Sequence, residues 1–342
     1  MNCNDCSSCR AGDRGSALVL AMVVVALVST LAVRFSGQFL VAATQIENRL
    51  LVTRYQHYLE GAESLAAVVL EQDGLDGDVD HSGEAWARAL PPLAIDEGIL
   101  RMAIQDAQGR INLNSLAQTT QWINDTGASP AIRFTPMQRH FIRLLQTFED
   151  HPVSEYDAVL LTEAVIDWLD ADQTSTGAGG AEAVYYGGGE PAYEPSDAHF
   201  RSVSELRMVR HVTPALYERL RPCLVALPQA TPLNVNTMDA RLLRTFNALD
   251  TLEPLEASQV QGLLQDRERQ PFPSLADFLA HELVAPLDIG RQQGTTDHYS
   301  TGSSHFLLDG EVLEGGVSTG ARSLLHRHDG GVSTIRRRYS VL

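Results

Sequence analysis

The sequence predicts an α+β protein. A long N-terminal helix, membrane-spanning in its first half, would pack on an antiparallel sheet, and a large, mostly α-helical insertion would interrupt that sheet. Three observations predict this class: an uncharged stretch from Ala17 to Val33, helical periodicity to about Gln72, and strand-like alternation at 99–114 and again from His298. Between the two strand-like regions, apolar residues recur with the spacing of an α-helix.

The chain carries a strong excess of negative charge. Its 342 residues include 43 acidic and 26 basic residues, every basic one an arginine, for a formal net charge of −17. Such a chain repels phosphate backbones, and the short cluster Arg336–Arg338 does not change this, so no nucleic-acid partner is expected. A hydrophobic content of 44% is that of a folded protein, long enough for two or three packed units.

The stretch from Ala17 to Val33 is long enough to cross a membrane, because a helix rises about 1.5 Å per residue and the hydrocarbon core is ~30 Å thick. Arg10 and Arg14 precede it, which places the N-terminus in the cytoplasm. The following residues 33–38 are a poor match to a signal-peptidase site. We therefore expect the segment to be retained as a single-pass anchor.

The helical pattern continues beyond the apolar stretch. From Phe35 to about Gln72 there is no proline, and turn-forming residues follow at 73–78. Apolar side chains recur at three- and four-residue steps, as in an amphipathic helix. The positions are Leu40, Val41, Ile46, Leu50, Leu51, Tyr55, Tyr58, Leu59, Ala62 and Leu65.

A basic leader that ends in glycine, followed by a membrane segment and an extended amphipathic helix, resembles the N-terminus of type IV pilin-like proteins. In that family a prepilin peptidase cuts directly after the glycine. The resemblance implies a cut between Gly15 and Ser16, with Ser16 as the mature N-terminus. Most pilin-like subunits carry glutamate as the fifth mature residue, where it pairs with the amino terminus of a neighbouring subunit, but here that residue is Leu20.

Three of the four cysteines, Cys3, Cys6 and Cys9, lie in the leader. Their spacing is that of a metal or iron–sulfur ligand set, but a fourth local ligand is missing, and a short leader without a role in folding is the other interpretation. Cleavage after Gly15 would remove all three. Cys223 would then be alone, with no intramolecular disulfide possible.

The rest of the chain divides into segments of helical and strand-like pattern. Two short strands are expected around the turn at Asp106–Gly109. A strand-like residue pattern returns at Thr231–Thr237, and an antiparallel meander is expected from His298. Helices are expected at 134–148, 155–171, 202–227, 238–248, 255–267 and 274–283.

Four segments in this order resemble general secretion pathway protein K, the family of large minor pseudopilins of the type II secretion system. They are DAQGRINLNSL, AVIDWLDAD, a glycine-rich GAEAVYYGGGEPAYEPSDAHFRSVSELRMV, and TPLNVNTMDARLL. The missing glutamate is also usual in this branch. The resemblance implies an inner-membrane protein whose main domain is periplasmic, and whose partners are the minor pseudopilins I, J and H, the major pseudopilin and the prepilin peptidase.

Acidic residues are concentrated beside the glycine-rich loop. Asp167 and Asp170 lie three apart on one helix face, Asp172 follows at the helix end, and Glu182 returns after the loop. Carboxylates gathered this closely repel one another, and a hard cation with six to eight oxygen ligands would relieve the repulsion. A solvated acidic loop that caps a helix is the alternative. The loop is not an EF-hand, because Ser175 and Ala181 stand at its glycine and glutamate positions.

The family resemblance implies one or two calcium ions in this insertion. Asp170, Asp172 and Glu182 are the best-matched ligands, and Asp167 and Asp197 are further candidates. The chain departs from the family pattern at two positions. Ala183 stands where the family often has an acid, and Asp197 where it often has asparagine.

Other functions are less well supported by the sequence. Segment 202–227 has the helix–turn–helix pattern of a DNA-binding helix-hairpin-helix. Such modules usually bind DNA phosphates through glycine-rich turns, but the turn at 210–213 has no glycine, so a packing role is favoured. No G-x-S-x-G, H-E-x-x-H or phosphate loop is present, and no enzyme activity is expected. Asp167 and Asp170 on one helical face make an unconvincing glycosidase pair.

We therefore expect a tip subunit that starts pseudopilus assembly with other minor pseudopilins and supports protein export across the outer membrane. The alternatives are a membrane-anchored, calcium-dependent periplasmic binding protein or hydrolase, and a minor pilin of a type IV pilus. The predicted parts are a leader at 1–15, a transmembrane helix at 16–34, the pilin-like helix and first strands at 35–115, the α-helical insertion with its calcium-type loop at 116–230, and the remaining sheet at 231–342.

Overall fold

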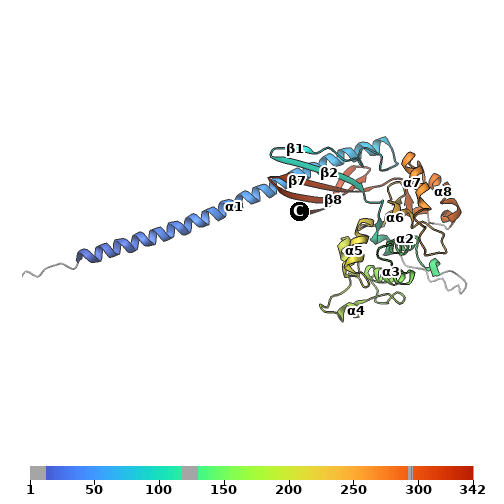
Figure 1. The fold of residues 1–342 in the computed structure, drawn as a ribbon, viewed down its shortest axis with the longest axis horizontal. Coiled ribbons are helices and arrows are strands. Elements are labelled where there is room, and N and C mark those ends of the chain that lie inside the picture. The colour runs from blue at the N-terminus through green and yellow to red at the C-terminus, as the bar shows by residue number, and fades with distance from the viewer. Residues whose placement is uncertain (1–12, 118–129, 292–293, 295, 342) are drawn as a thin grey trace, which may run out of the picture. The chain divides into compact units, whose positions relative to one another are not determined.

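The computed structural model describes residues 13–117, 130–291, 294 and 296–341 (Figure 1). Cys3, Cys6, Cys9 and the first twelve residues of the predicted leader lie outside the described residues. The chain divides into two units, 1–60 and 61–342. The helices are α1 (Asp13–Asp76), α2 (Pro136–Leu145), α3 (Glu155–Leu169), α4 (Ala183–Gly187), α5 (Pro214–Leu220), α6 (Ala240–Leu243), α7 (Val260–Arg269) and α8 (Leu275–Ala280). Short 3-10 helices lie at Leu113–Ala117, Pro130–Arg133, Val203–Met208, Arg221–Cys223, Ala285–Leu287, Ile289–Arg291 and Thr296–His298.

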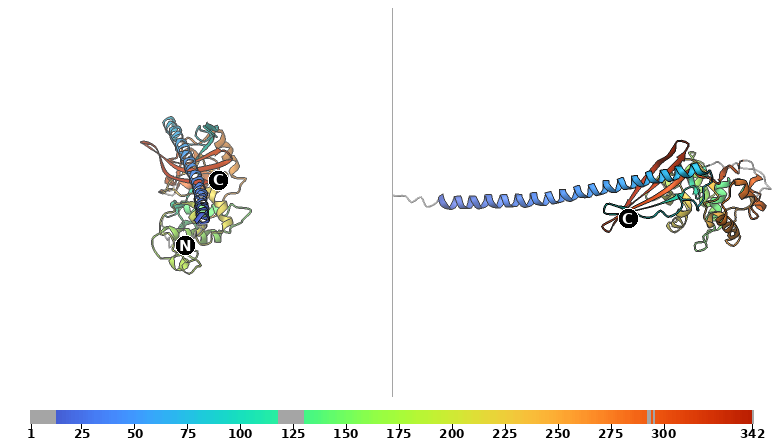
Figure 2. Two further views of the ribbon diagram at one scale, coloured as in Figure 1. Left: turned by 90° about the vertical axis from the view of Figure 1, so that its left-hand side faces the viewer. Right: turned by 90° about the horizontal axis from the view of Figure 1, so that it is seen from above.

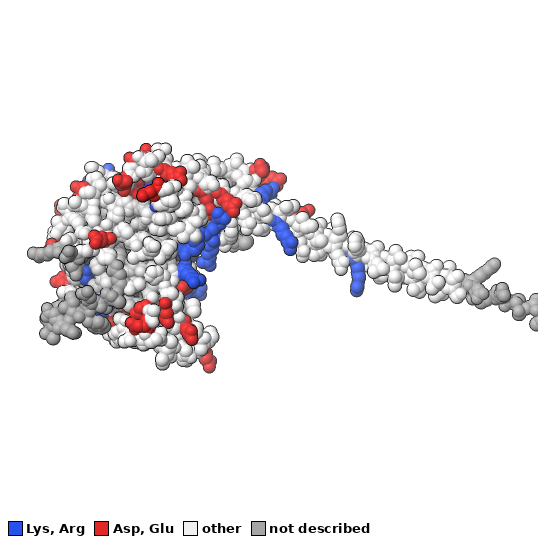
Figure 3. Space-filling model, turned by 180° about the vertical axis from the view of Figure 1, so that it is seen from behind, with Lys and Arg blue, Asp and Glu red and all other residues white. Residues whose placement is uncertain are grey.

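The first unit contributes the greater part of α1. The predicted uncharged stretch is helical throughout, and the side chains from Ser16 to Val41 are exposed. In Figure 3 this part of the helix carries almost no charged side chains. Among the described residues α1 is the one helix that is long and apolar enough to cross a membrane. The predicted long N-terminal helix is confirmed, and it ends at Asp76.

The second unit contains a five-stranded antiparallel sheet of order β1-β2-β7-β8-β9. Glycine permits its tight turns: Gly315 and Gly316, between β7 and β8, have φ of 59° and 83°, in the left-handed region that suits a two-residue hairpin. The predicted C-terminal meander is therefore confirmed. The strands are β1 (Leu93–Ile95), β2 (Gly98–Asp106), β7 (His305–Glu314), β8 (Val317–His328) and β9 (Gly331–Val341).

The strands predicted around Asp106–Gly109 do form, but they do not pair with each other. β2 pairs with β1 and β7, whereas β3 (Ile111–Asn112) pairs in parallel with β4 (Leu224–Val225). The two strands therefore do not form a hairpin, because β2 lies between β1 and β7, and β3 finds its partner about 110 residues further along the chain. The strand predicted at Thr231–Thr237 is reduced to β5 (Leu233–Asn234), which pairs with β6 (Tyr299–Ser300).

The last turns of α1 cover one face of the sheet. Ala62, Ala66 and Leu70 recur at four-residue steps and are fully or almost fully buried. The opposite face meets the base of the insertion, where Val225 and Leu227 contact Leu307 of β7 and its neighbours in a small apolar cluster. The sheet is thus covered on both faces, and this arrangement confirms the predicted α+β class.

The insertion leaves the sheet at the end of β2 and returns at the start of β7, and Figures 1 and 2 show its helices gathered at that end of the sheet. Asp106 is paired with Phe306, so the two ends of the insertion are neighbours. The predicted helices at 134–148 and 155–171 correspond to α2 and α3. Segment 202–227 is broken into short pieces, because Pro214 begins α5 and Pro222 lies in the 3-10 helix Arg221–Cys223 that follows it. The domain boundaries expected from the sequence stay predictions.

Candidate metal centre

The site is built on the C-terminal end of α3. Ser154 caps the start of this helix by accepting a hydrogen bond from the Asp157 N–H, and Asp170 ends it in an extended conformation. Asp167, in the last turn, is fully buried. Its carboxylate accepts the Thr176 N–H at 3.0 and 3.2 Å. The helix end is thereby tied to the loop that follows it.

A second carboxylate, from within α3, accepts a hydrogen bond from the glycine-rich loop. Glu163, two per cent exposed, accepts the Gly179 N–H at 2.8 Å and forms an ion pair with Arg133 at 2.7 Å. Gly177 has a φ of 61°, and a Cβ on Gly179 would lie 2.2 Å from the carbonyl oxygen of Leu160. The loop therefore requires glycine at these positions in order to approach α3 this closely.

A segment predicted only to pack also supports the loop. The Arg210 guanidinium donates to the carbonyl oxygen of Gly180 at 2.9 Å, and the Arg210 N–H donates to the Tyr186 hydroxyl at 3.1 Å. Tyr186, in α4, is buried and lies edge to face on Trp168 of α3. The loop is therefore fixed at both of its ends.

This framework brings together the three residues that the sequence analysis ranks first as ligands. One oxygen each of Asp170, Asp172 and Glu182 lies within 4.8 Å of the other two. Asp170 is the residue after α3 and Glu182 the residue before α4, so both are placed by helix ends. Their role as ligands stays a prediction.

Several carboxylate oxygens of the site are buried without a hydrogen-bond partner. They are Oδ1 of Asp170, both oxygens of Glu182, and Oδ1 of Asp197. Asp197 adopts a φ of 45°, and its Oδ2 accepts from the Gln173 side chain at 3.2 Å. A buried acceptor without a partner costs free energy, so these oxygens are arranged for a donor or a cation that no described part of the polypeptide supplies.

The pKa values of three carboxylates at the site are raised, as expected for buried and closely spaced negative charges. Burial, with the charges of Asp167 and other neighbouring acids, raises the pKa of Glu182 to about 7. Burial and the same kind of repulsion raise the pKa of Asp170 to about 6. Burial also raises the pKa of Asp167, although the hydrogen bonds from Thr176 oppose the shift. Concentrated negative charge is therefore unfavourable here without a cation.

The donor set suits a hard cation. All the converging atoms are carboxylate oxygens, which calcium binds in sets of six to eight, and neither a thiol nor an imidazole is among them. The unpartnered oxygens of Asp170, Glu182 and Asp197 are the ones such an ion would satisfy. Asp172 is exposed, so it would close the site from the solvent side.

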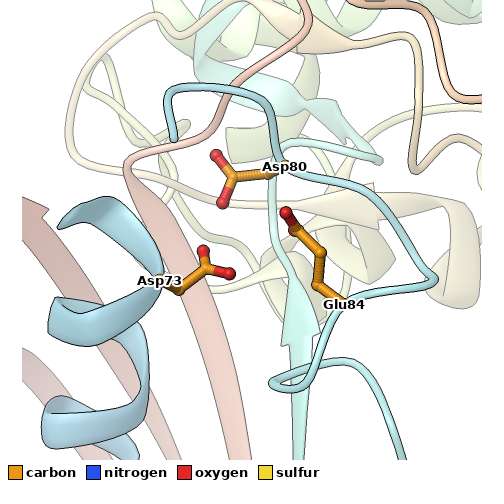
Figure 4. Close-up of side chains that lie close together, drawn as sticks. All are labelled: Asp73, Asp80 and Glu84. Atoms are coloured by element: carbon orange, nitrogen blue, oxygen red, sulfur yellow. The ribbon is translucent and has the colours of Figure 1, made fainter. Parts of the chain in front are cut away.

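A second acidic group, Asp73, Asp80 and Glu84, has another explanation. Figure 4 shows the three carboxylates pointing toward one another from the end of α1 and the loop that follows it. The Arg327 guanidinium donates to Asp73 at 2.9 Å and to Asp80 at 2.6 Å. Glu84 accepts the indole N–H of Trp86 at 2.8 Å. A cation is already present here in the form of Arg327, so this group is an ion-pair network.

The predicted processing residues lie at the start of α1. Gly15 and Ser16 are helical, and Leu20 is 68 per cent exposed on the helix surface. Their roles in cleavage and assembly stay predictions. Cys223 is buried, and burial raises the pKa of its thiol to about 12, so it is an unreactive core residue.

Sequence and structure comparisons place the chain among known proteins. Two family models of the type II secretion system protein K match, one over residues 109–229 and the other over 233–301. Both matched ranges lie within the insertion, between the end of β2 and the start of β7.

Curated relatives extend the match over the whole chain. The type II secretion system protein K of Pseudomonas aeruginosa is 33% identical over 96% of this chain and 93% of its own length. The protein K of Klebsiella pneumoniae is 29% identical over 96% of this chain and 97% of its own. That of Aeromonas hydrophila is 33% identical over 82% of this chain and 83% of its own.

A solved structure has the same fold. It is the crystal structure of the GspK-GspI-GspJ complex from the type 2 secretion system of enterotoxigenic Escherichia coli. A chain of it superposes with a TM-score of 0.73 at 23% identity, covering 87% of this chain and all of that one. From the family models and the 33% identity over nearly its full length, the chain belongs to the type II secretion system protein K family, whose members are minor pseudopilins, structural proteins rather than enzymes.

Proposed function

We propose that this minor pseudopilin is the tip subunit of the pseudopilus and that it starts assembly in the inner membrane with minor pseudopilins I and J, with H joining below. Major pseudopilins would then add beneath this complex, and the tip would face the substrates or the outer-membrane channel. The related Escherichia coli protein occurs in a complex with its I and J counterparts. The observation that carries the tip position is Leu20.

The argument from Leu20 is electrostatic. After a cut behind Gly15, the fifth residue would be a leucine within an uncharged helix. A carboxylate at that depth is costly in lipid unless it is paired, which makes it a marker of subunit register. A subunit without it offers no partner to the amine of a subunit above. The end of the filament is the one place where no subunit lies above.

The insertion supports the same position. Its helices gather at one end of the sheet and add an apolar core of their own. A lobe of this size on one end of a pilin-like domain would obstruct a further subunit stacked on that end. We infer a single-pass inner-membrane protein with residues 61–342 in the periplasm.

We further propose that Asp170, Asp172 and Glu182, with Asp167 and Asp197, hold calcium. The support is the set of buried carboxylate oxygens without partners. Bound calcium would neutralise the repulsion among these carboxylates. The chain's own part is to hold them in place through the glycine loop, Glu163 and Arg210.

The first experiment is the intact mass and N-terminal sequence of the protein from membranes with and without prepilin peptidase. We expect a chain that begins at Ser16 and appears only with the peptidase. An uncut chain would remove the basis of the tip proposal.

The second experiment tests position directly. An epitope tag is introduced at Glu190, an exposed residue of the insertion. Immunogold labelling then locates the tag on pseudopili from cells that overproduce the major subunit. We expect label at one end only, whereas label along the filament would contradict the tip position. A tagged major pseudopilin is the control, because it must label the whole length.

A further inference from the structure

The last strand of the sheet presents an open edge. β9 (Gly331–Val341) ends the strand order β1-β2-β7-β8-β9 and is paired only with β8. From Ser333 to Ser340 every residue is exposed except the half-buried Arg337, so no other described part of the chain covers this edge. The opposite edge, β1, is three residues long. The sheet therefore has one long edge available for pairing.

Along an edge strand, alternate residues direct their backbone N–H and C=O groups away from the sheet. Near the start of β9 the Val332 N–H is satisfied by the Glu71 carboxylate at 3.0 Å. Ile335 has no partner on β8, so a bulge interrupts the ladder there, and beyond it Arg336 to Ser340 continue in regular register. This half of the strand is a template for one more strand.

The edge also carries uncompensated positive charge. Arg336 and Arg338 are paired across the ladder with Leu324 and Arg322, which places both on the face of the sheet away from α1. Arg336 donates to the carbonyl oxygens of Arg201 and Ala226, and within the described residues neither arginine has a carboxylate partner. Figure 3 shows arginine side chains gathered on one side of the globular unit, between two groups of acidic ones.

At this level the three strands carry Asp309, Arg322 and Arg338, one acid followed by two arginines. Asp309 of β7 lies opposite Arg322 of β8, and the Arg322 guanidinium donates to both carboxylate oxygens, at 2.6 and 2.9 Å. Arg338 of β9 lies opposite Arg322 on the other side. Arg322 is already compensated, so Arg338 lacks a counter-charge. An acidic side chain on a sixth strand would supply it.

We propose that β9 binds an extended acidic segment of a different protein by strand addition, with a carboxylate opposite Arg338. Backbone hydrogen bonds to the outward groups of β9 would give affinity, and the arginines would give charge selectivity. A second copy of this chain does not fit, because antiparallel pairing centred on Arg336 would place this arginine opposite its own copy and would leave Arg338 opposite a threonine, without a carboxylate. The inference does not depend on the position of the subunit in the filament.

The test uses the purified full chain in detergent and a nine-residue synthetic peptide with glutamate at alternate positions and valine or threonine between them. A matched peptide with lysine in place of each glutamate is the control. Fluorescence anisotropy measures binding, and residue-resolved hydrogen exchange measures protection of the β9 amides. We expect binding of the acidic peptide alone, with protection at alternate residues between Arg336 and Ser340, beyond the bulge.

Two variants separate pairing from general attraction. Arg338→Glu is expected to weaken binding about 3- to 10-fold, since a favourable cross-strand pair becomes a repulsive one. Arg269→Glu, on exposed α7, makes the same charge change elsewhere and is expected to leave binding unchanged. Thermal unfolding by circular dichroism confirms that both variants fold. The proposal would be overturned if the acidic peptide bound without protecting the β9 amides, or if the lysine peptide bound equally well. It would also be overturned if Arg338→Glu and Arg269→Glu lost the same amount of peptide affinity.

Discussion

Glu63 and Arg337 form a bidentate ion pair that joins the last turns of α1 to β9. Both Nε and Nη2 of Arg337 donate to the Glu63 carboxylate, the first at 2.6 Å. Ser323 and Thr334 donate to the same carboxylate. Burial alone would raise the pKa of Glu63, but the hydrogen bonds from Arg337 and the two hydroxyls outweigh it and lower that pKa.

The two halves of this pair are expected to respond unequally to mutation. Arg337→Met leaves a buried carboxylate with no cation and should lower the free energy of unfolding by about 2–4 kcal/mol. Glu63→Gln removes the carboxylate from the more exposed arginine and should cost about 1–2 kcal/mol. Urea unfolding followed by circular dichroism measures both. Equal losses would mean that the burial of Glu63 does not matter.

Removing a single predicted ligand should weaken calcium binding sharply. Glu182→Gln and Asp170→Asn each remove a charge from the cluster, and we expect the calcium affinity to fall by about 10- to 100-fold. Isothermal titration calorimetry on EDTA-treated protein gives the values. Glu190→Gln, an exposed acid outside the cluster, is the matched control and should bind as the parent does. If all three variants bind alike, the cluster is not the site.

Gly179 tests whether the loop geometry matters for binding. A Cβ at this position would lie 2.2 Å from the carbonyl oxygen of Leu160, so Gly179→Ala should push the loop away from α3 and break its hydrogen bond to Glu163. We expect faster hydrogen exchange in the loop and weaker calcium binding, although no ligand is altered. Gly187→Ala is the control, because nothing lies within 4 Å of the added carbon. Unchanged exchange in Gly179→Ala would contradict the tight approach.

His305 should make the protein sensitive to acid. It is almost fully buried and stacks on His326 at 4.6 Å between ring centroids. Burial, together with the charge that His326 can carry, lowers the pKa of His305 to about 4. Between pH 6.5 and 4 the unfolded chain therefore binds a proton that the folded chain does not bind, so the folded state loses stability as the pH falls through this range.

The expected loss from His305 is about 1–3 kcal/mol between pH 7 and 4, beyond what other groups contribute. Denaturant unfolding across this range should show a shallower decline for His305→Gln than for the parent. His199→Gln, which alters an exposed histidine, should follow the parent curve. Parallel curves for the parent and His305→Gln would rule out this contribution.

The elements that the sequence predicts well are those set by local pattern. The long helix follows from uninterrupted periodicity, and the meander follows from alternation between glycine turns such as Gly315-Gly316. The two strands expected around Asp106–Gly109 form, but the sequence does not show which strands they pair with, because distant partners decide the pairing. β2 lies beside β7, some two hundred residues later, and no local signal reports this.

The same distinction holds for the candidate site. The sequence pattern indicates an acidic cluster beside a glycine loop, and the family resemblance ranks Asp170, Asp172 and Glu182 as its ligands. The function of Glu163 cannot be foreseen, since it depends on a backbone N–H sixteen residues away. The pairing of Arg327 with Asp80 joins residues 247 apart, which no spacing rule covers.

The pairing of Asp106 with Phe306 has an evolutionary consequence. The whole helical lobe leaves the sheet and returns to it at one rung, the Asp106–Phe306 pair at the end of the β2–β7 ladder. Its ends are therefore already close in space, and a chain that passed directly from β2 to β7 would keep every strand in register. The lobe is a separable addition to a smaller domain, so lineages can enlarge, shrink or replace it without redesigning the sheet that carries it.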